Sequence, residues 1–128
     1  MEPPNWARRL VSRMSGDYQV SLPTLNWKTR RVVSSSGYCN LNGRVIGVGA
    51  GSDKQDARLA VLHEMSHLIL ILTVDEYQGQ HDDCFYDFLW PIIRRYRFPM
   101  KEALEREAGH HRRVVARTYR RGGGRMKF

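Results

Sequence analysis

The segment from about residue 54 to residue 72 constrains the fold more than any other part of the sequence. Its second half is apolar on almost every side of a helix, with aliphatic residues or methionine at positions 61, 62, 65 and 68–71. A helix that is apolar all round lies in the interior of a protein. We therefore expect a central buried helix. The three ionisable side chains within it, His63, Glu64 and His67, need partners because burying an unsatisfied polar group is costly.

These side chains belong to the sequence His63-Glu64-Met65-Ser66-His67, an H-E-x-x-H motif. Residues four apart share one face of a helix, so His63 and His67 can direct ring nitrogens to one zinc ion. Glu64 lies about 100° round the helix from His63, where it can act as general base on a zinc-activated water. The alternative is two histidines that only hydrogen-bond within the core. We predict one Zn²⁺ ion, with Glu64 as the catalytic residue.

A catalytic zinc site has three protein ligands and one open position, so a third ligand is required. His81 is the leading candidate, at the entrance to the next predicted helix, with Asp82 and Asp83 beside it to orient its ring. It can also be an ordinary polar residue at a helix entry. The competing ligands are three carboxylates and a thiol: Asp75, Glu76, Asp87 and Cys84. We assign His110 and His111 to a run of basic residues and not to the site.

The rest of the sequence predicts a small α+β domain. A short helix carries Trp6, Leu10 and Met14 on one stripe and ends near Gly16. Runs that favour strands follow at 18–22, 26–34, 38–41 and 44–48, the last two flanking Asn42-Gly43, which suits a two-residue type I′ turn. We expect a small antiparallel sheet over about residues 18–49, packed on the helix of about 54–72.

Capping signals place the other helix boundaries. Ser52 and Gln55 fit a capping box at the start of the buried helix. A further helix starts near residues 82–83, and Pro91 is expected to kink or divide it. The last helix starts near Pro99, and the glycines at 122–124 end regular structure.

Positive charge is concentrated at the C-terminal end. Residues 1–93 hold 9 Lys and Arg against 10 Asp and Glu, whereas residues 94–128 hold 12 against 3. We expect one metallopeptidase-like domain over 1–98, followed at 99–128 by a basic helix and a flexible Arg/Gly-rich tail. Arginine-rich surfaces bind phosphates without reading sequence, which makes DNA the expected partner. The candidate contacts are Arg94, Arg95, Arg97, Arg112, Arg113, Arg117, Arg120 and Arg121; the alternative is a solvated helix face paired with Glu102, Glu105 and Glu107.

Cysteine content and hydrophobicity indicate the compartment in which the protein is expected to work. Cys39 and Cys84 are too few for a disulfide framework in 128 residues. The N-terminus lacks the features of a secretory signal, and the longest apolar run is far shorter than the ~20 residues of a membrane span. We expect a cytoplasmic monomer without membrane contact, in a host cell's cytoplasm if a phage encodes the chain.

The stretch Gly37-Tyr38-Cys39, the Asn-Gly hairpin, the H-E-M-x-H helix and His81 followed by Phe85 together resemble the SprT-like zinc metallopeptidases. The resemblance covers about residues 25–95. It implies a minimal zincin-like fold, with His63, His67 and His81 as ligands and Glu64 as general base. Asp82 stands where the family has Gly after its third His, and the four-cysteine zinc ribbon of many relatives is absent.

Two further expectations concern the substrate. In zincin folds a peptide pairs with an edge strand, and residues 44–49 are the expected edge, with Gly47, Gly49 and Gly51 leaving room for a peptide or merely allowing close packing. A hydroxyl from Tyr77, Tyr86 or Tyr96 is available to stabilise the oxyanion.

The function expected from all these features is zinc-dependent endopeptidase activity on proteins associated with or crosslinked to DNA. The alternatives are a non-catalytic DNA-binding protein with a structural zinc, and a regulatory peptidase that cleaves one partner such as a repressor.

Overall fold

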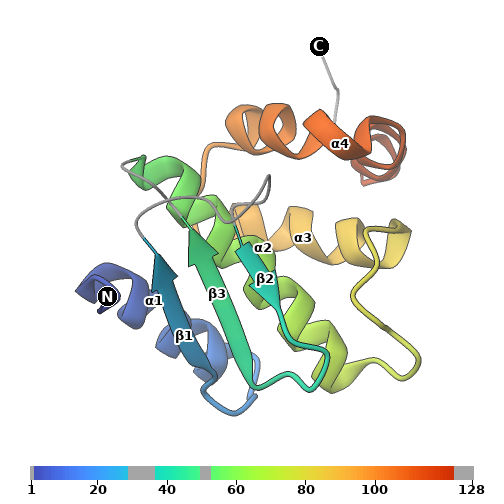
Figure 1. Ribbon diagram of the computed structural model, residues 1–128. Helices are drawn as coiled ribbons and strands as arrows, with labels where there is room; N and C mark the ends of the chain where they lie inside the picture. Colours follow the sequence, from blue (N-terminus) through green and yellow to red (C-terminus); the bar gives the residue numbers. More distant parts are fainter. Residues whose placement is uncertain (1, 29–36, 50–52, 123–128) are drawn as a thin grey trace. The chain divides into compact units, whose positions relative to one another are not determined.

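The computed structural model describes residues 2–28, 37–49 and 53–122. In these ranges the elements are α1 (Asn5–Asp17), β1 (Thr24–Lys28), β2 (Gly37–Cys39), β3 (Val45–Gly49), α2 (Lys54–Thr73), α3 (Asp83–Arg95) and α4 (Met100–Arg121) (Figure 1). The predicted α+β class is confirmed. The chain divides into two compact units, Met1–Gly79 and Gln80–Phe128. The division at residue 98 into a domain and a basic arm stays a prediction, because a compact unit is not by itself an independent domain.

The first unit contains a three-stranded mixed sheet in the order β1-β3-β2. β1 pairs with β3 in parallel, from Thr24 opposite Val45 to Lys28 opposite Gly49, whereas β2 pairs with β3 antiparallel. The prediction of an antiparallel sheet is therefore wrong for one of its two strand pairs. The expected edge strand is wrong as well, since β3 is the central strand and has a partner on both sides.

The β2–β3 hairpin is confirmed, but its turn differs from the prediction. A type I′ turn needs positive φ at both central residues, and of Asn42 and Gly43 only Gly43 has it, at 68°. The turn is closed instead by the Gly43 N–H, which donates to the Asn40 carbonyl at 2.9 Å. The predicted strand at 18–22 is not formed: α1 extends to Asp17, and Gln19 takes a left-handed φ of 55°.

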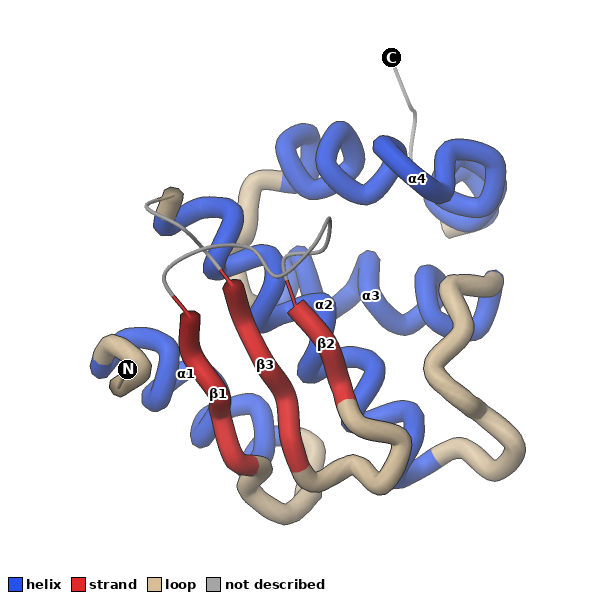
Figure 2. Tube along the Cα trace, in the orientation of Figure 1, coloured by secondary structure: helices blue, strands red, loops and turns tan. Residues whose placement is uncertain are grey.

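α1 and α2 lie on one face of this sheet (Figure 2). Trp6 of α1 meets Trp27 of β1 edge to face, with ring centroids 5.7 Å apart. Ile46, Val48, Leu62 and Met65 are almost fully buried, and α2 buries residues on nearly all sides as its composition predicted. Its cap is Asp53, whose carboxylate accepts from the N–H groups of residues 55 and 56; Ser52 of the expected capping box lies outside the described residues.

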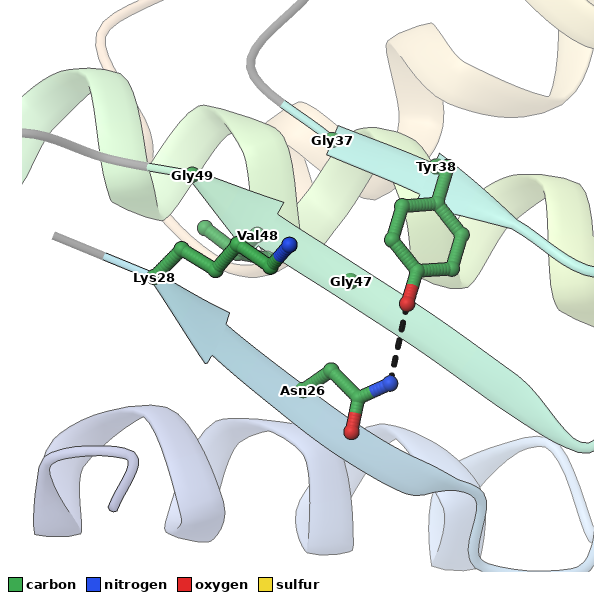
Figure 3. Close-up of a pocket in the computed structure, with 7 residues that line it drawn as sticks. All are labelled: Asn26, Lys28, Gly37, Tyr38, Gly47, Val48 and Gly49. Atoms are coloured by element: carbon green, nitrogen blue, oxygen red, sulfur yellow. Dashed lines mark hydrogen bonds between the residues drawn. The ribbon is translucent and has the colours of Figure 1, made fainter. Parts of the chain in front are cut away.

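The opposite face of the sheet carries a small bridge over β3. The Asn26 side-chain amide donates to the Tyr38 hydroxyl at 2.9 Å, and Gly47 lies between them in register (Figure 3). A Cβ atom at Gly47 would stand only 2.1 Å from the Tyr38 ring. Gly47 therefore makes room for this tyrosine, which favours the packing explanation of that glycine over a place for a peptide. Gly51 lies outside the described residues.

The second unit consists of α3 and α4. Asp82 caps α3 by accepting from the Phe85 N–H at 3.1 Å, and the helix continues through Pro91, so the expected division there is not found. The Trp90 indole N–H donates to the Thr118 hydroxyl at 2.9 Å and joins the two helices. α4 starts after Pro99 and ends before Gly122, as predicted, but has a break at His111. No helix in the described ranges has an apolar stretch long enough to cross a membrane.

Candidate metal centre

His63 and His67 lie one turn apart on α2 and direct the same ring atom towards each other. Their Nε2 atoms are 3.2 Å apart, and His67 is buried whereas His63 is partly exposed. Two nitrogens that each lie about 2.0–2.1 Å from one tetrahedral zinc ion are roughly 3.3 Å apart. The spacing of this pair therefore fits zinc coordination.

Tyr77 fixes the ring of the second histidine. Its hydroxyl lies 2.7 Å from His67 Nδ1, and both residues are buried. Metal-ligating histidines characteristically hydrogen-bond through the nitrogen that does not face the metal, which sets the tautomer and orients the ring. With Nδ1 held by Tyr77, Nε2 of His67 is the nitrogen directed towards His63.

This contact changes what was expected of the tyrosines. Tyr77 was a candidate oxyanion donor, but its hydroxyl is engaged with His67. The Tyr86 hydroxyl donates to the Glu107 carboxylate at 3.0 Å. No sequence pattern predicts the Tyr77 contact, because a loop has no regular spacing that would bring a tyrosine back to the helix before it.

Glu64 lies between α2 and the edge strand β2. Its side chain is buried, with 7% of the residue exposed. A Cβ atom at Gly37 would stand 3.0 Å from Glu64 Oε2, so glycine at this position leaves space for the carboxylate. Burial, with a smaller contribution from the negative charge of Glu64, raises the pKa of the Cys39 thiol to about 12. Gly37 and Cys39, the two β2 residues that face α2, therefore both lie close to Glu64, the predicted general base.

The three predicted histidines are brought together. One ligand atom from each of His63, His67 and His81 lies within 4.8 Å of the others, a group that can bind a metal ion. Within the described ranges no other set of three His, Cys, Asp or Glu side chains does so, and the competing candidates Asp75, Glu76, Asp87 and Cys84 belong to none. The donor set, three imidazoles, matches the chemistry of zinc.

His81 directly precedes Asp82, the cap of α3. Its ring contacts Phe85 edge to face at a centroid distance of 5.3 Å and stacks on His111 at 4.4 Å. The sequence analysis assigns His111 to the basic run, and the stacking on His81 corrects that assignment. Two adjacent histidines followed by two arginines look like a charged helix face, and nothing local separates one of them from the run.

The arginines of the second unit are partly neutralised by α3. Arg117 and Arg121 both bind the Asp83 carboxylate, at 2.5 and 2.9 Å, and Arg121 also binds Asp87 at 2.5 Å. These two guanidinium groups lower the pKa of Asp83 to about 2. Arg94 lies over the ring of Tyr119 at 5.9 Å. Of the eight predicted DNA contacts, at least Arg117 and Arg121 are therefore engaged with carboxylates of the same unit.

Comparisons with protein-family models, curated proteins and solved structures found no match.

Proposed function

We propose that the chain is a zinc-dependent endopeptidase of the SprT-like, zincin kind. The observation that carries the proposal is the convergence of ligand atoms of His63, His67 and His81 within 4.8 Å. The first two belong to α2, the helix that also carries the buried Glu64. A structural zinc site has no need of a carboxylate one residue from its first ligand. A hydrolytic site does, because a base must remove a proton from the attacking water.

The residues of the chain then have separate roles. Bound zinc lowers the pKa of a water molecule towards about 7 and polarises a carbonyl group. The Glu64 carboxylate accepts the proton from the attacking water and delivers it to the leaving amine. Tyr77 orients His67 through Nδ1. The burial of Glu64 beside β2 holds its carboxylate in one place. This matters because a base displaced by about 1 Å can lose a factor of ~100 in rate.

The substrate is proposed to pair with β2, which replaces the edge expected from the sequence. The Asn40 N–H donates to the Val45 carbonyl at 3.0 Å, so the adjacent pair, Cys39 and Ile46, is the non-hydrogen-bonded kind. The backbone N–H and C=O of Cys39 consequently point away from β3. A peptide that adds to the sheet on this side lies next to the strand that Glu64 adjoins.

The basic second unit is proposed to hold the enzyme on DNA. Arg113 and Arg120 are exposed on α4, and Tyr119 offers an aromatic ring beside Arg94. Removing Arg113 and Arg120 should lower the salt dependence of DNA binding by about one unit of slope each. Removing Arg117 should change the salt dependence of DNA binding less, because its guanidinium group must leave Asp83 before it can bind a phosphate.

The experiment that tests the activity compares the wild-type chain with Glu64→Gln. The assay follows cleavage of a protein bound or crosslinked to DNA, with zinc content measured on the same samples. We expect Glu64→Gln to retain zinc and lose activity by a factor of about 10²–10⁴. A wild-type protein that holds stoichiometric zinc and cleaves neither DNA-bound nor free proteins would contradict the proposal and favour a structural zinc.

A further inference from the structure

The second unit holds one contact that the proposed chemistry does not use, between His81 and His111. Their rings are nearly parallel, with an interplanar angle of 14° and centroids 4.4 Å apart. The two rings are therefore stacked, and the contact is not an edge-to-face one. It joins the residue before the α3 cap to the middle of α4, thirty positions later in the chain.

The backbone of α4 departs from a helix at the residue that makes this contact. His111 has φ −133° and ψ 39°, whereas the residues on both sides continue the helix. Gly109, two residues earlier, lowers the cost of a break because glycine is less favourable than alanine in a helix by about 1 kcal/mol. The break sets the direction in which the His111 ring leaves the helix.

Other contacts fix the same short segment around His81. Phe85 contacts the His81 ring edge to face, and its backbone N–H donates to the Asp82 carboxylate that caps α3. Asp83 is bound by Arg117 and Arg121 from the part of α4 that follows the break. The C-terminal half of α4 therefore contacts this segment both at the His81 ring and at the carboxylate two residues later.

We infer that His111 is a positioning residue for the third metal ligand. The inference rests on the proposed function in so far as His81 binds the metal. His81 stands before the first turn of α3, where the helix backbone does not restrict its ring, so an unsupported side chain would sample several rotamers and lose entropy on binding metal. Stacking by His111 and the edge-to-face contact with Phe85 restrict the ring before the metal arrives. Groups that orient metal ligands typically contribute 10–100-fold in metal affinity.

The test compares two substitutions of similar bulk. His111→Phe keeps a flat ring that can stack, and His111→Leu fills the space without one. Glu105→Ala, at an exposed position of α4 before the break, is the control for changes to this helix. Zinc affinity is measured by competition with a chromophoric chelator, the site geometry by the visible spectrum of the cobalt(II)-substituted protein, and folding by far-ultraviolet circular dichroism.

We expect His111→Leu to bind zinc about tenfold more weakly than the wild type and to alter the cobalt spectrum. His111→Phe and Glu105→Ala should remain close to wild type in both measurements. Equal affinities for the Leu and Phe variants, whether both high or both low, would overturn the inference. Failure of the wild-type protein to bind zinc would instead overturn the proposed function, so the two failures are distinguishable.

Discussion

Gly37 provides the sharpest test of where the predicted general base lies. In Gly37→Ala the new Cβ would stand 2.6 Å from the Gly47 carbonyl oxygen and 3.0 Å from Glu64 Oε2. The first distance is about 0.8 Å shorter than the 3.4 Å at which ordinary contact begins, and its partner is backbone of the central strand, which cannot rotate away. Overpacking of this kind costs about 1–3 kcal/mol. For a chain of this length, that lowers the midpoint of thermal unfolding by roughly 4–12 °C.

The same substitution should separate metal binding from catalysis. The atoms displaced belong to β2 and to Glu64, not to His63 or His67, so zinc stoichiometry should be unchanged. The kcat/KM for peptide hydrolysis should fall about 100-fold, because the carboxylate is moved from its place. Gly16→Ala is the control, since a Cβ there meets nothing within 4 Å. If Gly37→Ala unfolds at the same temperature as Gly16→Ala and keeps wild-type activity, the placement of Glu64 against β2 is wrong.

Three other predictions follow from named contacts. Tyr77→Phe should weaken zinc binding by about 10–100-fold in a chelator competition, because it removes the hydroxyl that orients the second histidine of the motif; unchanged affinity would remove Tyr77 from the site. Asp83 should titrate near its folded pKa of about 2 in an NMR experiment, and since that pKa is lowered from 3.8, its contribution to stability is present above pH 3.8 and lost as the pH falls towards 2. The thiol of Cys39 should react slowly with disulfide reagents at pH 8, and faster in Glu64→Gln, where the negative charge that helps to raise its pKa is gone.

The buried helix could be predicted from the sequence because its signals are local. The predicted range 54–72 differs from α2 by one residue, since the apolar positions and the polar residues before them fix both burial and start. The Asn-Gly dipeptide likewise identified a hairpin. The parallel pairing of β1 with β3 had no such signal, because strands that are not joined by a tight turn select partners through packing and not through nearby residues.

In the site too, some contacts could be predicted from neighbouring residues, whereas others depend on segments that are distant in the sequence. Helical spacing is enough to bring His63 and His67 together. The same spacing determines where Glu64 lies on the helix relative to them. The contacts of Tyr77 with His67 and of His111 with His81 depend on where a loop and a second helix return. The engagement of Arg117 and Arg121 by Asp83 was missed for a related reason, as the count of charges shows an excess but not which charges are paired.

The central claim is that three histidines of this chain hold one zinc ion. Anomalous diffraction from crystals of the zinc-loaded protein, combined with its zinc stoichiometry in solution, tests it most directly. We predict one zinc per chain, bound by Nε2 of His63 and His67 and by a ring nitrogen of His81, with no fourth protein ligand. Three results would contradict this claim: no bound zinc, a carboxylate or thiol ligand in place of His81, or a fourth protein side chain on the zinc ion.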